Sequence, residues 1–258
     1  MFVNLSNHPS NNWSEVQYAS ANENFGEIVD IKCPILDASV GEEDVKMLAT
    51  GIVAKVIELN PDCVMCVGEF SFSYAVITKL RELGFKVVSV KSNIEVKTYT
   101  ENGIDKREIK YKFLNFEEYK DYFSLEVVSP NYHNDILLNC SYRYSSDAFD
   151  AQCIRDSNKI ASKILDFPLE PVVDKDIEER KNILRNYIEQ INKIAPKSII
   201  LDGEFHTWYA MASLLKRLGY NVVCKCSNRN VVEVQNDDGT TTKTTNYKFV
   251  RYRKLEDI

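Results

Sequence analysis

Short apolar runs alternate with amphipathic segments along this chain. Runs at residues 2–5, 27–31 and 63–67 are the length of single strands and predict buried strands. Between the second and third runs, apolar side chains recur every three or four residues, which predicts a long helix with one buried face. The residues that form this stripe are Val45, Leu48, Ile52, Val56 and Leu59.

The same order of elements returns in the second half, with apolar runs at 136–140, 164–167 and 198–201. In each half the third strand passes directly into a helix at the tripeptide Gly-Glu-Phe. A fourth strand, at 86–90 or 221–225, then leads into a hairpin. The expected turns are "ENG" at 101–103 and "DDG" at 237–239, because such residues suit tight hairpin turns.

The two halves are copies of each other. Residues 61–93 align without a gap on residues 196–228, an offset of 135, with 13 identical pairs over 33 positions. The same offset pairs "VNLS" at 3–6 with "LNCS" at 138–141, and Gln17 with Gln152. An offset one residue larger pairs "IVD" at 28–30 with "ILD" at 164–166, and "YKFLNF" with "YKFVRY". The chain is therefore a tandem duplication.

Strands that alternate with helices form right-handed βαβ units and a parallel sheet. The sequence thus predicts an α/β fold with two tandem Rossmann-like domains, each a mostly parallel sheet with an antiparallel edge hairpin. We expect the domains at 1–120 and 136–258, with a connector at 121–135. Duplicated halves of this kind are expected to pack as a pseudo-twofold dimer.

Composition narrows the classes of function. The chain has 32 Lys and Arg residues and 38 Asp and Glu residues, which gives a net charge of −6. This charge argues against a protein that binds long nucleic acid, because such proteins usually carry a basic surface. No apolar run approaches the ~20 residues of a membrane span, and residues 1–10 lack the pattern of a secretory signal. The seven cysteines lack the spacing of a disulfide framework, which indicates a protein of the reducing cytoplasm.

No cofactor or metal is expected. The sequence has no P-loop, and no GxGxxG follows the first strand. Cys63 and Cys66 would point to opposite faces of one strand, so they could not share a metal ion. Cys224 and Cys226 would share a face, but the first copy has no equivalent cysteines.

Ligands of open α/β sheets bind beyond the carboxyl ends of the strands, at the point where strand order reverses. The loop after the first strand falls there and is dense in small hydrogen-bonding side chains, which suits an anion beside a helix N-terminus. An alternative is that Ser10, Asn11, Asn12 and Ser145 only cap helices. The loop candidates are Asn4, Ser6, Asn7, His8 and Ser10, with Asn139, Ser141, Tyr142, Arg143 and Ser145 in the second copy.

The strand-to-helix turn is a second candidate. It contains Gly68, Glu69 and Phe70 in the first copy, and Gly203, Glu204, Phe205, His206 and Thr207 in the second. Glycine permits a close backbone approach, and the glutamate could accept a hydroxyl proton or bind a ribose hydroxyl. The alternative is a carboxylate that interacts with the helix dipole, followed by Ser71 or Thr207 as the cap.

The remaining candidates are weaker. Ser92-Asn93 and Ser227-Asn228 follow the fourth strand, where turn chemistry is the favoured interpretation and ligand contact the alternative. The hairpin strands interleave aromatic and basic residues, and an edge strand is favoured over a nucleic-acid strip. Trp13, Gln17 and Gln152, expected on the first helix of each copy, complete the ligand-binding candidates.

The opening "FVNLSNHPSNNWSEVQ", the "GEF" turn and the closing "YKFVRYR" resemble small stand-alone proteins of the CRISPR-associated Rossmann-fold (CARF) family. The resemblance implies a cyclic oligoadenylate ligand, bound in the cleft between the two copies, and a role in type III CRISPR antiviral signalling. It also implies metal-independent cleavage of the ring, or its sequestration. The catalytic candidates that the resemblance implies are His8, Arg143, Glu69 and Glu204. Arg143 would bind phosphate, and His8 would act as acid or base.

Two other classes stay open. One is a hydrolase or transferase that acts on a mononucleotide or nucleoside through Glu69 or Glu204. The other is a scaffold without catalysis, whose duplicated surface binds a protein. The expected partner is thus a cyclic oligonucleotide. Binding to long nucleic acid or to a membrane is not expected. The fused chain is expected to be a monomer or a homodimer.

Overall fold

A computed structural model describes most of the chain in two compact units. The first unit contains Met1–Pro34, Leu48–Tyr119 and Asp257–Ile258, and the second contains Ile35–Met47 and Lys120–Glu256. The described residues are 1–101, 104–120, 133–141, 145–170, 172, 175–235 and 241–258.

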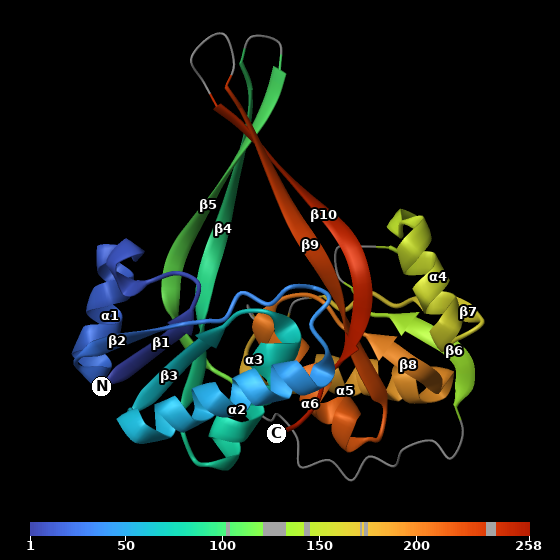
Figure 1. The fold of residues 1–258 in the computed structure, drawn as a ribbon, viewed down its shortest axis with the longest axis horizontal. Helices are drawn as coiled ribbons and strands as arrows, with labels where there is room; N and C mark the ends of the chain where they lie inside the picture. Colours follow the sequence, from blue (N-terminus) through green and yellow to red (C-terminus); the bar gives the residue numbers. More distant parts are fainter. Residues whose placement is uncertain (102–103, 121–132, 142–144, 171, 173–174, 236–240) are drawn as a thin grey trace. The chain divides into compact units, whose positions relative to one another are not determined.

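The first unit is built on a five-stranded sheet in the order β2-β1-β3-β4-β5 (Figure 1). Strands β1 to β4 are parallel and β5 is antiparallel to β4. The elements are β1 (Phe2–Ser6), the short 3-10 helix η1 (Ser10–Asn12), α1 (Glu15–Phe25), β2 (Ile28–Lys32), α2 (Glu42–Leu59), β3 (Cys63–Val67), α3 (Phe70–Glu82), β4 (Val87–Glu101) and β5 (Ile104–Glu118). Residues 42–47 of α2 belong to the second unit and the rest of this helix to the first.

The second unit repeats this topology, with the sheet order β10-β9-β8-β6-β7 (Figure 1). The predicted fold class, an α/β protein with two mostly parallel sheets and antiparallel edges, is therefore confirmed. The elements are β6 (Asn134–Asn139), η2 (Ser146–Ala148), α4 (Ala151–Ile160), β7 (Lys163–Asp166), α5 (Ile177–Ile194), β8 (Pro196–Ile200), α6 (Phe205–Arg217), β9 (Asn221–Gln235) and β10 (Thr241–Lys254).

The fourth strand of each unit is much longer than predicted. β4 pairs with β3 only at Val87 and Val88, but its pairing with β5 runs from Val88 to Glu101. The two strands thus continue beyond the sheet as a two-stranded ribbon, and β9 with β10 forms a similar ribbon in the second unit (Figure 1). The predicted hairpins are confirmed by the pairing of Glu101 with Ile104 and of Gln235 with Thr241.

The turn predicted at Ser92-Asn93 and Ser227-Asn228 is wrong. A β-bulge shifts the register between Lys91 and Ser92, and another lies between Phe249 and Arg251, opposite Cys226 and Ser227. The bulge absorbs one extra residue and increases the local twist, so the strand continues where the sequence suggested that it ends. β5 and β10 are edge strands, as favoured from the sequence.

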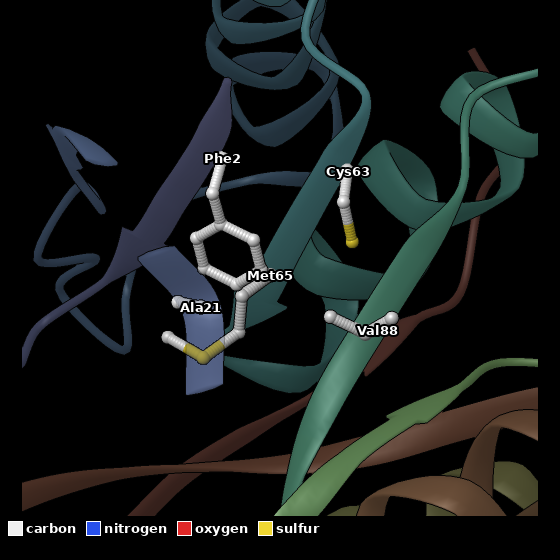
Figure 2. Close-up of a cluster of buried hydrophobic side chains, with 5 residues drawn as sticks. All are labelled: Phe2, Ala21, Cys63, Met65 and Val88. Atoms are coloured by element: carbon white, nitrogen blue, oxygen red, sulfur yellow. The ribbon is translucent and has the colours of Figure 1, made fainter. Parts of the chain in front are cut away.

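In the first unit, one face of the sheet is covered by a continuous apolar cluster. Phe2, Ala21, Cys63, Met65 and Val88 are at most 2% exposed (Figure 2). Burial of a side chain as large as Phe2, Met65 or Val88 stabilises the fold by about 1.5–3 kcal/mol. Trp13, Phe25, Ile28, Val67, Val90 and Phe116 pack against them. Trp13 lies before α1, not within it as expected, and its ring contacts those of Phe2 and Phe116.

The equivalent cluster of the second unit is partly polar. Leu137, Ala161, Ile200 and Val223 are buried, and Phe149, Ile160, Ile164 and Tyr252 pack against them. The Tyr252 hydroxyl lies 2.7 Å from Ser157 Oγ and 3.1 Å from Cys153 Sγ. Burial and the Cys153 contact raise the pKa of Tyr252, so the phenol stays protonated.

The two copies differ by one residue between the first strand and the first helix. β1 and β6 correspond at an offset of 135, but Ser14 caps α1 and Asp150 caps α4, an offset of 136. The counterpart of Gln17 is therefore Cys153, so the pairing of Gln17 with Gln152 is wrong. By the same shift Ser10 corresponds to Ser146 and Trp13 to Phe149. Among the described residues, no helix is long and apolar enough to cross a membrane.

Candidate ligand site at the carboxyl edge of each sheet

The strand order places the switch point of each sheet between its first and third strands. In the first unit the crossover after β1 leads to β2 on one side, and the next crossover places β3 on the other side. The loops after β1 and β3 therefore meet at this edge, where α/β sheets bind ligands. These are the loops that carry Asn4 to Ser10 and Gly68 to Phe70. The second unit has the same arrangement at β6 and β8.

Asn4 links the first two strands of the first unit at this edge. It pairs in register with Asp30 of β2, and its Nδ2 donates to Asp30 Oδ1 at 2.6 Å and to the His8 carbonyl at 2.9 Å. Its Oδ1 accepts from Ser6 Oγ at 2.8 Å. Because Asn4 is only 1% exposed and its amide bonds to protein groups, its role here is to shape the loop.

The backbone of His8 is held by several donors. Its carbonyl oxygen lies 2.9 Å from Asn4 Nδ2, 3.1 Å from Ser6 Oγ and 3.0 Å from Trp13 Nε1. Its N–H donates to Ser6 Oγ at 3.1 Å. The residue itself is exposed, as is Asn7. A loop held by these hydrogen bonds thus presents an exposed histidine at the switch point.

Asp30 completes this network from β2. The Ser10 N–H reaches both carboxylate oxygens at 3.0 and 3.1 Å, and Ser10 Oγ donates to Oδ2 at 2.9 Å. Ser10 therefore uses its hydroxyl to bind Asp30, and Ser14 is the residue that caps α1. The structure brings the predicted residues Asn4, Ser6, His8, Ser10 and Trp13 into one hydrogen-bonded group.

The second unit carries a matching network around Asp166. Asn139 Nδ2 donates to Asp166 Oδ1 at 2.6 Å, and the two residues pair in register. Ser146 donates its N–H at 2.9 Å and its hydroxyl at 2.7 Å, and Ser145 Oγ donates at 3.0 Å. Burial alone would raise the pKa of Asp166, but these hydrogen bonds lower it overall.

The end of β6 differs in detail from that of β1. Ser141 N–H donates to Asn139 Oδ1 at 3.3 Å, while the buried Ser141 Oγ has no hydrogen-bond partner among the described residues. Ser145 accepts from the Asp147 N–H and caps η2, as the capping alternative expected. The candidates Tyr142 and Arg143 lie outside the described residues.

Asp30 and Asp166 were not among the predicted site residues. The signal for them was present, because "IVD" and "ILD" align between the copies and end in these aspartates. What the pattern does not reveal is that each aspartate lies opposite an asparagine of the neighbouring strand. That pairing depends on strand register, which is a property of the folded sheet.

The glutamates of the two GEF turns cap helices. Glu69 Oε2 accepts from the Phe72 N–H at 3.0 Å and from Ser71 Oγ at 2.6 Å, and it is the N-cap of α3. Glu204 is the N-cap of α6, so the caps predicted at Ser71 and Thr207 are wrong. In each case the longer glutamate side chain reaches the first helical N–H groups, and the following hydroxyl donates to the same carboxylate.

Glu204 is held more extensively than a simple cap. It accepts from the His206 N–H, the Thr207 N–H and Thr207 Oγ1 at 2.9–3.0 Å, and its Oε1 lies 3.0 Å from His206 Nδ1. Although burial opposes ionisation, the contacts with His206 and Thr207 lower the pKa of Glu204 to about 2. Such a carboxylate is a poor proton acceptor near neutral pH.

Gly68 is required by a contact inside the protein. A Cβ at this position would lie 2.6 Å from Cys33 Sγ, so the close approach made possible by glycine is to this buried thiol. Phe70 and Phe205 begin α3 and α6, and Phe205 packs edge-on against Trp208. His206, at 3% exposure, and Thr207 are buried beside Glu204.

The other predicted residues lie apart from these loops. Gln17 is on α1, and Gln152 on α4 donates to Asp156 and accepts from Arg155. Ser92, Asn93, Ser227 and Asn228 lie on the ribbons beyond the β-bulges. The structure therefore does not bring these six residues into the hydrogen-bonded groups at the sheet edges.

Fold and site together define an α/β protein of two repeat-like halves, with 2-1-3-4-5 sheets and a polar network at the carboxyl edge of each. Residues 1–117 and 147–253 match the model of the uncharacterized protein MJ1673 family, and the chain belongs to that family. No curated protein sequence matches it.

Several solved structures show weak likeness to this chain. The Cap4 SAVED/CARF-domain containing receptor of Acinetobacter baumannii, solved with the cyclic trinucleotide 3'3'3'-cAAA, is 14% identical at a TM-score of 0.40, over 99% of this chain and 51% of that chain. Another structure of this receptor is 12% identical at a TM-score of 0.38, over 97% of this chain and 49% of that chain. L-asparaginase I from Vibrio cholerae O1 biovar eltor str. N16961 is 11% identical at a TM-score of 0.24, over 86% of this chain and 87% of that chain.

The chain spans about half the length of the Cap4 receptor chains. TM-scores below 0.5 do not establish a common fold or a common ligand.

Proposed function

We propose that this protein binds a cyclic oligonucleotide second messenger, a cyclic oligoadenylate, through the carboxyl edges of its sheets. The observation that carries the proposal is the repeated Asn–Asp–Ser network at the switch points, which in the first unit fixes the backbone of an exposed histidine. A repeated ligand is matched by a repeated site, because a ring of identical nucleotides offers each contact more than once. The CARF resemblance of the sequence points to the same ligand class.

We further propose that the first unit cleaves the ring. A ribose 2'-hydroxyl attacks the adjacent phosphorus, so an O2'–P bond forms and the P–O5' bond breaks, leaving a 2',3'-cyclic phosphate and a free 5'-hydroxyl. His8 removes the 2'-hydroxyl proton while water protonates the departing O5' atom, or His8 protonates O5' while water accepts the 2'-hydroxyl proton. The protein positions these groups in line, and no metal ion takes part in the proposed step.

The other candidates have different places in this proposal. Arg143 is proposed to bind phosphate. Glu204 is not assigned proton transfer, because its pKa of about 2 and its four contacts fix it as a helix cap. Glu69 caps α3 in the same way. The biological role that follows is regulation of type III CRISPR antiviral signalling by removal or sequestration of the messenger.

The test combines binding and turnover. Wild-type protein is titrated calorimetrically with cyclic tri-, tetra- and hexa-adenylate, and the products are resolved by chromatography. His8→Ala is expected to slow cleavage at least tenfold while ring affinity stays within a few-fold. His133→Ala is the matched control, since His133 is also exposed but contacts Tyr220, at a ring distance of 5.4 Å.

Binding without products would remove the cleavage step and leave sequestration. Equal turnover in His8→Ala and wild type would remove His8 from the mechanism. If none of the three rings binds, the proposed function is wrong.

A further inference from the structure

The side chains on the covered face of the sheet differ in polarity between the two units at four equivalent positions, one of which lies on the covering helix. The first unit has Val67, Val90, Phe116 and Ala21, and all four belong to or pack against its apolar cluster. The second unit has Asp202, Lys225, Tyr252 and Ser157. Two aliphatic side chains thus become a carboxylate and an ammonium group, and the two other changes each add a hydroxyl.

Lys225 lies on the covered face of the second sheet, towards its carboxyl edge. It follows Val223 by two residues on β9, and Val223 belongs to the buried cluster, so both side chains lie on one face. Its Nζ is 4.6 Å from the centroid of the Phe149 ring. β8 ends at Ile200, two residues before Asp202, and Ile200 pairs with Val223. Both charged residues therefore lie just beyond the last paired residues of β8.

The electrostatics connect Lys225 to this edge. Burial lowers the pKa of Lys225, while the nearby Asp202, Cys153 and Asp166 raise it again in part. Asp166 is the centre of the Asn139 network, so Lys225 is within electrostatic range of the candidate ligand site. A partly buried ammonium group costs free energy that a valine would not. A sheet that only had to pack could keep the valines of the first unit.

We propose that Lys225 and Asp202 form a phosphate-and-ribose subsite in the second unit, whose ammonium group binds a phosphodiester of the ring and whose carboxylate accepts a hydrogen bond from a neighbouring ribose hydroxyl. This subsite rests on the proposed function, and it makes the two halves of the duplication unequal. Carboxylates at the ends of such strands are suited to ribose hydroxyls, and lysine to phosphate.

The experiment measures ring affinity in four variants. Lys225→Met removes the charge and is expected to weaken binding of the preferred ring at least tenfold, and Lys225→Arg to keep affinity within about threefold. Asp202→Val combined with Lys225→Val restores the valine pair of the first unit; this variant is expected to fold and to lose affinity at least tenfold. Lys86→Met is the matched control, because Lys86 also lies over a phenyl ring, 5.3 Å from Phe25, but precedes β4 at the opposite edge.

Salt dependence separates a phosphate contact from a structural role. Between 50 and 500 mM NaCl the affinity of wild type should fall more than that of Lys225→Met, because the variant has lost a charged contact. Ring binding by wild type with affinity within twofold in Lys225→Met would overturn the subsite and leave the proposed function intact. No ring binding by wild type would overturn both.

Discussion

In the first unit, Trp13, Phe116 and Val90 close the face of the sheet beneath α1, whereas Phe149, Tyr252 and Lys225 occupy the equivalent places in the second unit. The apolar face is held by ring contacts such as that between Phe2 and Phe116, at 5.0 Å. The polar face is held by hydrogen bonds among Tyr252, Ser157 and Cys153. One topology thus tolerates two kinds of interior, provided that the polar groups of the second are paired.

The features that the two units share are of another kind. Both keep an asparagine opposite an aspartate at the first-strand edge, a glutamate that caps the helix after the third strand, and a bulge in the long ribbon. The first two features set backbone geometry at the switch point, and the bulge sets the course of the ribbon. The comparison therefore separates residues that build the edge from residues that give each edge its own chemistry.

The largest effect is expected at the asparagine–aspartate pair. Asn4→Leu removes the amide that binds Asp30 and the His8 carbonyl, and should reduce the free energy of unfolding by about 3 kcal/mol. Asn139→Leu should reduce the free energy of unfolding by less, about 2 kcal/mol, because Asp166 keeps donors from both Ser145 and Ser146. Urea unfolding measures the losses, and hydrogen exchange assigns each to its unit. Losses below 1 kcal/mol in both variants would contradict a shared structural role.

The acid stability of the second unit provides the next test. The pKa of Glu204 is about 2 in the folded protein against an ordinary value of 4.5, so its contribution is complete above about pH 4.5 and declines as the pH falls towards 2. Glu204→Gln should lower stability at pH 7 by roughly 2 kcal/mol and by progressively less below pH 4.5. Thermal unfolding between pH 7 and pH 3 checks this, and a loss that does not vary with pH would count against the ionised cap.

A smaller effect is expected inside the polar face. Tyr252→Phe and Ser157→Ala should each cost about 1 kcal/mol, because each leaves a buried hydroxyl with one partner fewer. The double variant recreates the Phe116 and Ala21 pair of the first unit, and should cost clearly less than the sum. A double-mutant cycle by urea unfolding measures this coupling, and strict additivity would show that the two hydroxyls do not act together.

The smallest stability effect is expected for Trp13→Phe. Phenylalanine is the natural residue at the equivalent position, Phe149, so packing against Phe2 and Phe116 is largely kept. The variant loses the indole N–H that donates to the His8 carbonyl, at a cost of about 0.5–1 kcal/mol. If His8 cleaves the ring, turnover should fall a few-fold while affinity changes little. Unchanged turnover would show that Trp13 does not position His8.

Much of the fold follows from local pattern. The apolar runs predicted the strands that begin at Phe2 and Cys63, the threes-and-fours spacing predicted α2, and the GEF turns predicted the starts of α3 and α6. The duplication doubled each of these signals. The loop after β1 was predicted as a site candidate because strand order fixes where a sheet edge lies.

Long-range features were not predictable in the same way. The partners of Asn4 and Asn139 come from neighbouring strands, so Asp30 and Asp166 were missed. The bulge after Lys91 depends on pairing with β5, and it concealed the continuation of the strand through Ser92. The one-residue shift between β6 and η2 only becomes visible once both helix caps are located.

The most direct test of the account is calorimetric titration of the wild-type chain with cyclic tri-, tetra- and hexa-adenylate, followed by chromatography of the mixtures. We predict saturable binding of at least one ring, with linear products that depend on His8. Absence of binding for all three rings would contradict it, and only the duplicated α/β fold with its paired edge networks would stand.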